Sequence, residues 1–167
     1  MKTRISILAI LSLAILAAVI LVAQRTELGV ISFQHFAPLL LPSSQLARNL
    51  ESNNTDLVRE SLAILRKRMD PSGAERAVQL LKSPDDYVWL NAADYLGALG
   101  RAEAVPYLIK GLRHTAWRSD TERINDLQLI TRQALGTNFV VWSNWWEQAH
   151  PGTNFDFDSA LGPIPRR

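Results

Sequence analysis

Oxygen-bearing side chains alternate with aromatic ones near the end of this chain. Asn154, Asp156 and Asp158 are separated by Phe155 and Phe157, a spacing that resembles the oxygen ligands at the start of a calcium-binding loop. The segment lacks the glycine and the closing glutamate of such a loop. We therefore expect no calcium site here.

The other side chains that could take part in catalysis or metal binding have simpler structural interpretations. Asp85 and Asp86 precede an apolar periodic stretch, where carboxylates act as helix N-caps, and we interpret Asp94 as a solvated position. His114 and His150 stand near the ends of predicted helices, where they typically cap carbonyl groups. The chain has no cysteine, no glycine-rich phosphate loop, no HExxH motif and no recognisable serine nucleophile. We predict no catalytic residue, no metal and no cofactor.

Three tryptophans share one face of the last predicted helix, because Trp142, Trp145 and Trp146 are spaced at i, i+3 and i+4. They either close the open end of a helical stack or form a docking patch for a partner. We favour the first interpretation, in which Trp142 and Trp146 are buried and Trp145 is the more exposed ring.

The elements that must position these residues are helices, since apolar residues recur at helical spacing from Ser43 onward and no stretch alternates like a strand. The predicted class is all-α. The expected helices span Ser43 to Ser52, Asp56 to Met69, Ala74 to Lys82, Asp86 to Leu99, Ala102 to His114, Asp120 to Leu135 and Phe139 to His150.

These helices form pairs that repeat along the chain. Leu50, Leu81 and Leu112 are separated by two equal steps of 31 residues, and the next pair needs a step of 36 because of extra residues in Thr115–Thr121. One helix pair cannot bury its own apolar face, so such a period indicates an α-solenoid of about three stacked pairs.

The middle unit resembles the short bacterial HEAT-like repeat of the phycobilisome-lyase type. The residues that carry this resemblance are Asp86, Val88, Ala92-Ala93, Leu96-Gly97, Gly100, Glu103-Ala104-Val105-Pro106, Leu108 and Leu112. The resemblance implies a repeat domain over about Ser43–His150 that serves mainly as an interaction surface. Trp89 departs from it, because the family usually has arginine after the valine.

Candidate partner-binding residues are aromatic or basic side chains that the repeat itself does not need. Trp89, which replaces a polar family position, and Trp117, which lies in the inserted loop, are the better candidates for a surface role. The predicted partner-binding residues are Trp89, Trp117, Arg118, Trp145, Phe155 and Phe157.

The N-terminal residues predict a membrane location. Residues 5–23 carry no charge and are long enough for a single transmembrane helix. Lys2 and Arg4 precede this stretch, which favours a domain on the periplasmic side of a bacterial inner membrane. A cleaved signal peptide is the alternative. The predicted divisions are an anchor (1–24), a juxtamembrane connector (25–42), the repeat domain (43–150) and an extended tail (151–167).

Charge argues against nucleic acid as a partner. The formal net charge is +2, but after Ala23 the chain has 16 basic and 16 acidic residues. We predict a membrane-tethered, non-enzymatic protein–protein interaction adaptor, an accessory subunit of a larger membrane complex, with no evident small-molecule substrate. The alternative is an enzyme or ligand-binding protein related to bilin lyase-type HEAT proteins.

Overall fold

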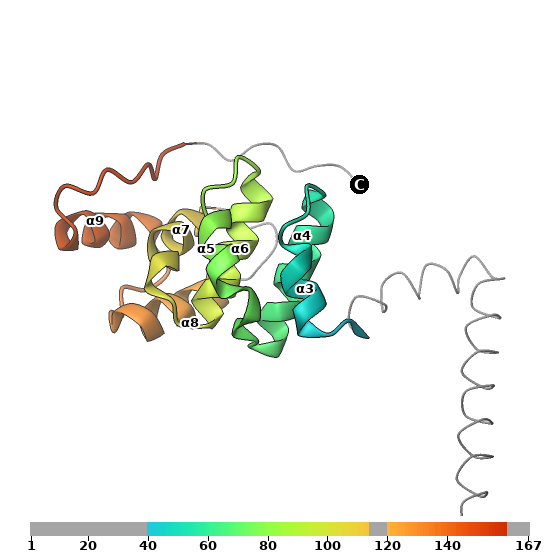
Figure 1. Ribbon diagram of the computed structural model, residues 1–167. Helices are drawn as coiled ribbons and strands as arrows, with labels where there is room; N and C mark the ends of the chain where they lie inside the picture. Colours follow the sequence, from blue (N-terminus) through green and yellow to red (C-terminus); the bar gives the residue numbers. More distant parts are fainter. Residues whose placement is uncertain (1–39, 114–119, 160–167) are drawn as a thin grey trace, which may run out of the picture. The chain divides into compact units, whose positions relative to one another are not determined.

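The computed structural model describes residues 40–113 and 120–159, and the helices named below all lie in the compact unit Pro42–Arg167. These residues form seven α-helices, two single 3₁₀ turns and no strand (Figure 1). The elements are α3 (Ser43–Asn49), α4 (Thr55–Arg68), η1 (Pro71–Gly73), α5 (Ala74–Leu80), α6 (Asp86–Ala98), η2 (Ala102–Ala104), α7 (Val105–Gly111), α8 (Asp120–Thr131) and α9 (Phe139–Ala149).

The predicted fold class needs a correction, although its all-α part is confirmed. It combined a transmembrane helix with a short solenoid of helix pairs. Among the residues that the structure describes, no helix is long and apolar enough to cross a membrane. The span expected over residues 5–23 lies outside the described residues, and the residues that the structure does describe form helices but no such span.

Short polar side chains begin several of the helices. The Asn54 carboxamide accepts two backbone N–H bonds from the first turn of α4, and the Asp85 carboxylate does the same for α6. Asn138 accepts one such bond at the start of α9. These bonds satisfy N–H groups that have no partner within the helix. The expected N-cap role is confirmed for Asp85, whereas Asp86 is the first residue of α6.

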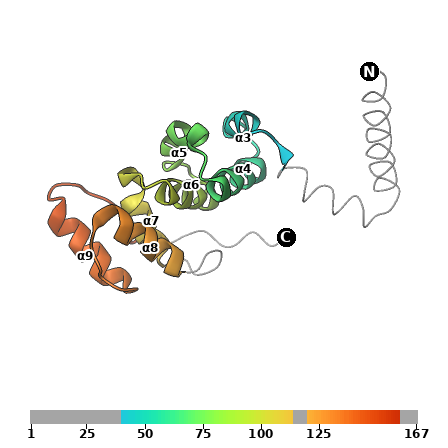
Figure 2. The same ribbon diagram turned by 90° about the horizontal axis from the view of Figure 1, so that it is seen from below.

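The helices pack around α6. Helix α6 contacts α4, α5, α7 and α8, while α3 packs on α4 and α9 packs on α7. Figure 2 shows α3 and α5 on the same side of α4 and α6. Helix α6 is consequently buried nearly all round, with only one intermediate position, Asn91, between Tyr87 and Gly97.

The period predicted from the sequence is also the period of these helices. Leu50, Leu81 and Leu112 directly follow α3, α5 and α7, and all three side chains are buried. Each leucine anchors the end of one helix against its neighbours. The step of 31 residues is therefore the distance along the chain between equivalent positions of packed helices.

A left-handed residue recurs at the same steps. Met69 (φ 51°), Gly100 (φ 74°) and Gly136 (φ 71°) are 31 and 36 residues apart. Glycine suits this conformation because it lacks the Cβ that clashes there. In the last pair, Arg132 is also left-handed (φ 60°), and α8 ends four residues before the predicted end at Leu135.

Candidate functional site

A buried ion pair joins three helices in the middle of the stack. The Arg123 guanidinium is fully buried; its Nε donates to Asp94 Oδ1 at 2.9 Å and its Nη2 donates to Asp94 Oδ2 at 3.1 Å. Arg123 Nη1 donates to the carbonyl oxygen of Gly111 at 2.9 Å. The interpretation of Asp94 as solvated is wrong, and α6, α7 and α8 are linked by this pair.

The tryptophans of α9 are buried to different degrees. Trp142 is fully buried and its Nε1 donates to the Gly136 carbonyl oxygen at 2.8 Å, which confirms its expected place in the core. Trp145 and Trp146 are both partly exposed, so the expected burial of Trp146 is wrong. The Trp146 ring stacks on His150 with 3.7 Å between centroids. The cluster thus includes a histidine that sequence reasoning did not connect with it.

His150 also ends α9 as expected. It is the residue after the last turn, and its Nδ1 lies 3.0 Å from the Trp146 carbonyl oxygen. This confirms the capping interpretation for His150. His114 lies outside the described residues, as do Trp117 and Arg118 of the inserted loop.

Trp89 is not the exposed ring that the sequence suggested. Only 5% of its surface is accessible, and its Nε1 donates to Asp86 Oδ1 at 2.9 Å. The indole ring lies 6.0 Å from the Tyr107 ring, and the Lys110 ammonium is 5.5 Å from its centroid. The expected exposure is therefore wrong; whether Trp89 serves a partner stays a prediction.

The residues after α9 return to pack on the stack, and we call Asn154–Ser159 the docked segment (Figure 1). The Phe155 ring meets the edge of Tyr107 at 4.9 Å, and the Phe157 ring lies 6.2 Å from Phe139. Phe157 is only 5% exposed. The segment has no regular secondary structure, as expected for the tail, but its second phenylalanine belongs to the core.

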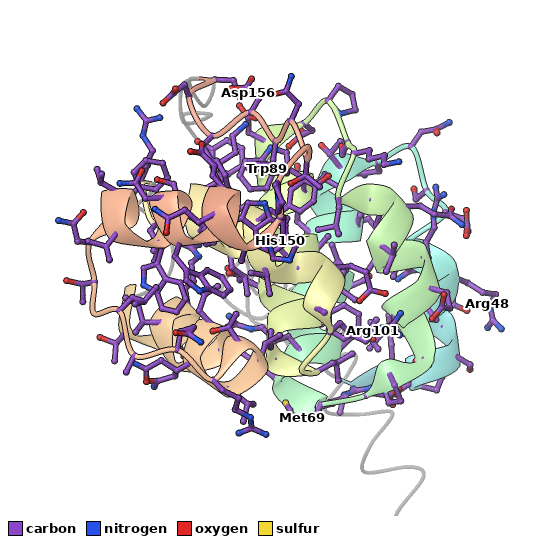
Figure 3. All side chains as sticks on the ribbon, turned by 90° about the vertical axis from the view of Figure 1, so that its left-hand side faces the viewer. Arg48, Met69, Trp89, Arg101, His150 and Asp156 are labelled. Carbon is purple, nitrogen blue, oxygen red and sulfur yellow. The ribbon has the colours of Figure 1, made fainter. Side chains whose placement is uncertain are left out.

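The docked segment lies along three side chains spaced three residues apart, which we call the α7 face: Tyr107 and Lys110 of α7, and Arg113, two residues after its end. Such spacing places side chains on one side of a helical stretch. Figure 3 labels Trp89 and Asp156 in this region. Two predicted partner-binding residues, Phe155 and Phe157, thus meet at the α7 face, next to Trp89.

Two cations of the α7 face bind the docked segment. Arg113 Nη1 donates to the Phe157 carbonyl oxygen at 2.9 Å and lies 3.5 Å from the Asp158 carboxylate. Lys110 Nζ donates to the Ser159 hydroxyl. The docked segment is therefore recognised through its backbone and its charge as well as through its rings.

Aromatic rings position both cations. The Lys110 ammonium lies over Trp89, and the Arg113 guanidinium lies over Phe139 at 5.2 Å from the ring centroid. Cation–π contacts of this kind are worth about 0.5–1 kcal/mol at exposed sites. The two positive charges of the α7 face thus lie over aromatic rings.

Asp156 shapes the docked segment from within. One carboxylate oxygen accepts the backbone N–H groups of Asp158 and Ser159, each at 3.0 Å. The Ser159 backbone bond, followed by its side chain, the Asp158 backbone and the charge of Lys110, lowers the pKa of Asp156 below its usual value. The residues that the structure describes contain no group of three possible metal ligands. The carboxylate acts as a turn former.

The docked segment is held by weakly favourable terms. Burying the Phe157 ring contributes about 1.5–3 kcal/mol, and each aromatic pair adds about 0.5–1.5 kcal/mol. Exposed ion pairs such as Arg113–Asp158 add about 0–1 kcal/mol. Ordering the backbone opposes these gains by about 1–2 kcal/mol per residue. The net stabilisation of the docked segment is therefore smaller than the sum of its contacts.

The last helix pair exposes apolar side chains. Among the described residues, the large exposed apolar side chains are Leu40, Met69, Leu129, Val140 and Val141. Three of these five lie on α8 or α9, with Leu129 53%, Val140 55% and Val141 42% exposed. Val141 shares a helix face with Trp145, four residues later. Terminal repeats of a stack normally present polar residues to solvent, and this pair departs from that rule.

Comparison of the chain with protein-family models, with curated proteins and with solved structures gave no match.

Proposed function

We propose that this protein is a non-enzymatic protein–protein interaction adaptor whose stacked helix pairs bind a partner protein. The observation that carries this proposal is the exposure of Leu129, Val140 and Val141 on the last helix pair. Such side chains are expected to be covered when a partner binds, because burial of apolar surface drives most protein association.

The arrangement of the helices supports the same proposal. Each helix contacts helices that are near it in the chain, as in the stacked repeats that serve as interaction surfaces. The resemblance to the HEAT-like repeat of the phycobilisome-lyase type stays a proposal that rests on the middle unit. The membrane location stays a prediction from residues 1–24, which lie outside the described residues.

A site-specific photo-crosslinker at Val141 of the full chain tests the proposal in the native host. We expect one discrete protein adduct at Val141 and none at Glu60, an exposed position of α4 that serves as the control. Equal labelling at both positions, or none at either, would contradict the proposal.

A substitution at the same position measures its contribution. Val141→Asp should weaken binding by about 30-fold, corresponding to about 2 kcal/mol for a central interface residue. Stability should not fall, because Val141 is the third residue of α9 and a carboxylate in the first turn of a helix is favourable. Unchanged partner affinity in the folded variant would exclude α9 as the binding surface.

A further inference from the structure

The side chains of the docked segment complement those of the α7 face, as those of a bound peptide complement its receptor. The docked segment offers two rings, Phe155 and Phe157, separated by Asp156. The receptor side offers the Tyr107 and Phe139 rings at 4.9 and 6.2 Å from them. In an extended chain, residues two apart point to the same side, so both phenylalanines can reach the stack together.

Charge is matched in the same way. Asp158 lies 3.5 Å from Arg113, the charge of Lys110 acts on Asp156, and an aromatic ring lies beneath each cation. Because Arg113 also donates to the Phe157 carbonyl oxygen, its binding depends on the position of the segment's backbone as well as on its charge. An extended acidic segment with aromatic residues two positions apart fits these groups.

Part of the shape of the docked segment comes from hydrogen bonds within the segment itself. The Asp156 carboxylate binds the N–H groups of Asp158 and Ser159, so the turn is formed within the segment. Beyond α9, the described residues contain no helix or strand that release would break. Exchange of this segment for another of the same chemistry therefore leaves the helices intact.

We propose that the α7 face is a docking surface for an extended acidic peptide of a partner protein, with two aromatic side chains at i and i+2, and that the docked segment of this chain is its resident competitor. The inference rests on the proposed function and adds the chemistry of one bound partner segment. The docked segment competes at the high effective concentration of a tethered ligand, typically in the millimolar range. A partner peptide must therefore bind tightly enough, or be concentrated enough, to displace the docked segment.

A peptide with the sequence of residues 153–159 is the probe. In the full chain with Phe155→Ser and Phe157→Ser, which vacates the α7 face, the peptide should shift the NMR ring signals of Tyr107 and Phe139. Binding to the unmodified chain should be at least about tenfold weaker because of the tethered competitor. A control peptide with serine in place of both phenylalanines should cause no shift.

The inference is overturned if the vacated chain, helical by circular dichroism, shows no shift at about millimolar peptide, the range of the tethered competitor. It is also overturned if both peptides act alike. A dimer that exchanges docked segments at rising concentration would identify the occupant as a second copy of this chain and would likewise overturn it.

A charge reversal tests the inference without removing buried rings. In the full chain with Lys110→Glu and Arg113→Glu, a peptide with lysine in place of both aspartates should bind better than the original peptide. Absence of this preference would overturn the inference, even if the double phenylalanine variant failed to fold. Crosslinking at Val141 does not involve the α7 face, so the two proposals can fail separately.

Discussion

At the scale of single residues, the enclosed contact between Asp94 and Arg123 makes the clearest prediction. Asp94→Asn keeps the size of the side chain but removes the carboxylate that Arg123 binds through two nitrogens. Breaking a buried pair by removing one partner typically costs about 3–5 kcal/mol, because the remaining charge stays out of water. We expect a loss of this size in the free energy of unfolding, measured by urea denaturation.

An exposed ion pair provides the matched control. Glu75 lies 3.0 Å from Arg101 and its side chain is 85% exposed. Glu75→Gln should change stability by less than about 1 kcal/mol. Replacement of both buried partners, by Asp94→Leu and Arg123→Met, should be milder than Asp94→Asn. If Asp94→Asn were as mild as Glu75→Gln, the buried pair would not link the three helices.

Residue roles that depend on near neighbours could be predicted, and roles that depend on distant ones could not. Asp85 caps the N–H groups two and three positions ahead, so its type and place were sufficient. Asp94 binds a residue 29 positions away, and its own neighbours gave no partner. A signal was present: Asp94 follows Ala92-Ala93 and precedes Tyr95-Leu96 in a helix that is apolar on nearly every side.

At the scale of elements, the docked segment should respond to acid before the helices do. Folded-state hydrogen bonds, first that of the Ser159 backbone, lower the pKa of Asp156. Its stabilising contribution is therefore complete above the unfolded-state pKa of about 4 and is lost as pH falls through the folded-state value. We expect the Phe157 ring signal to move towards its free position below about pH 4 while helicity persists.

Asp156→Asn is the control for this titration. Its amide does not ionise in this range, so the acid-dependent movement of the Phe157 signal should disappear. Simultaneous loss of helicity and of the Phe157 signal in the unmodified chain would contradict the prediction. It would mean that the docked segment and the helical stack form one cooperative unit.

The elements themselves were predictable in number and order, because periodic apolar residues and caps are local signals. The end of α8 was not predictable, because Arg132 adopts a left-handed conformation and no glycine at that position indicates it. The packing of the docked segment was also missed. An extended segment has no helical period, and its contacts with the α7 face lie more than 40 positions back along the chain.

At the scale of the whole molecule, stability should be highest at α6 and lowest at the outer helices. Helix α6 contacts four other helices, whereas α3 and α9 lie at the two ends of the described stack. Opening of outer units is easier because each unit is held mainly by its neighbours. Native-state hydrogen exchange should show the slowest amides in α6 and faster exchange in α3 and α9. Slowest exchange in α9 would contradict this order.

The repeat is the large-scale feature that sequence alone revealed most directly. Leu50, Leu81 and Leu112 mark the same structural position, so sliding the chain on itself located the helix ends. The surface that the stack presents could not be read in this way. Trp89 was expected at the surface because side chains that cover it, Tyr107 among them, come from other elements.

The position of Phe157 in the core has a consequence for biosynthesis. A chain leaves the ribosome from its N-terminus and its earlier parts begin to fold first, at about 5–20 residues added per second. Phe157 follows the last helix, so it arrives after Tyr107, Lys110 and Phe139 have been made. Until then, Tyr107, Lys110 and Phe139 lack the residues that contact them in the folded chain.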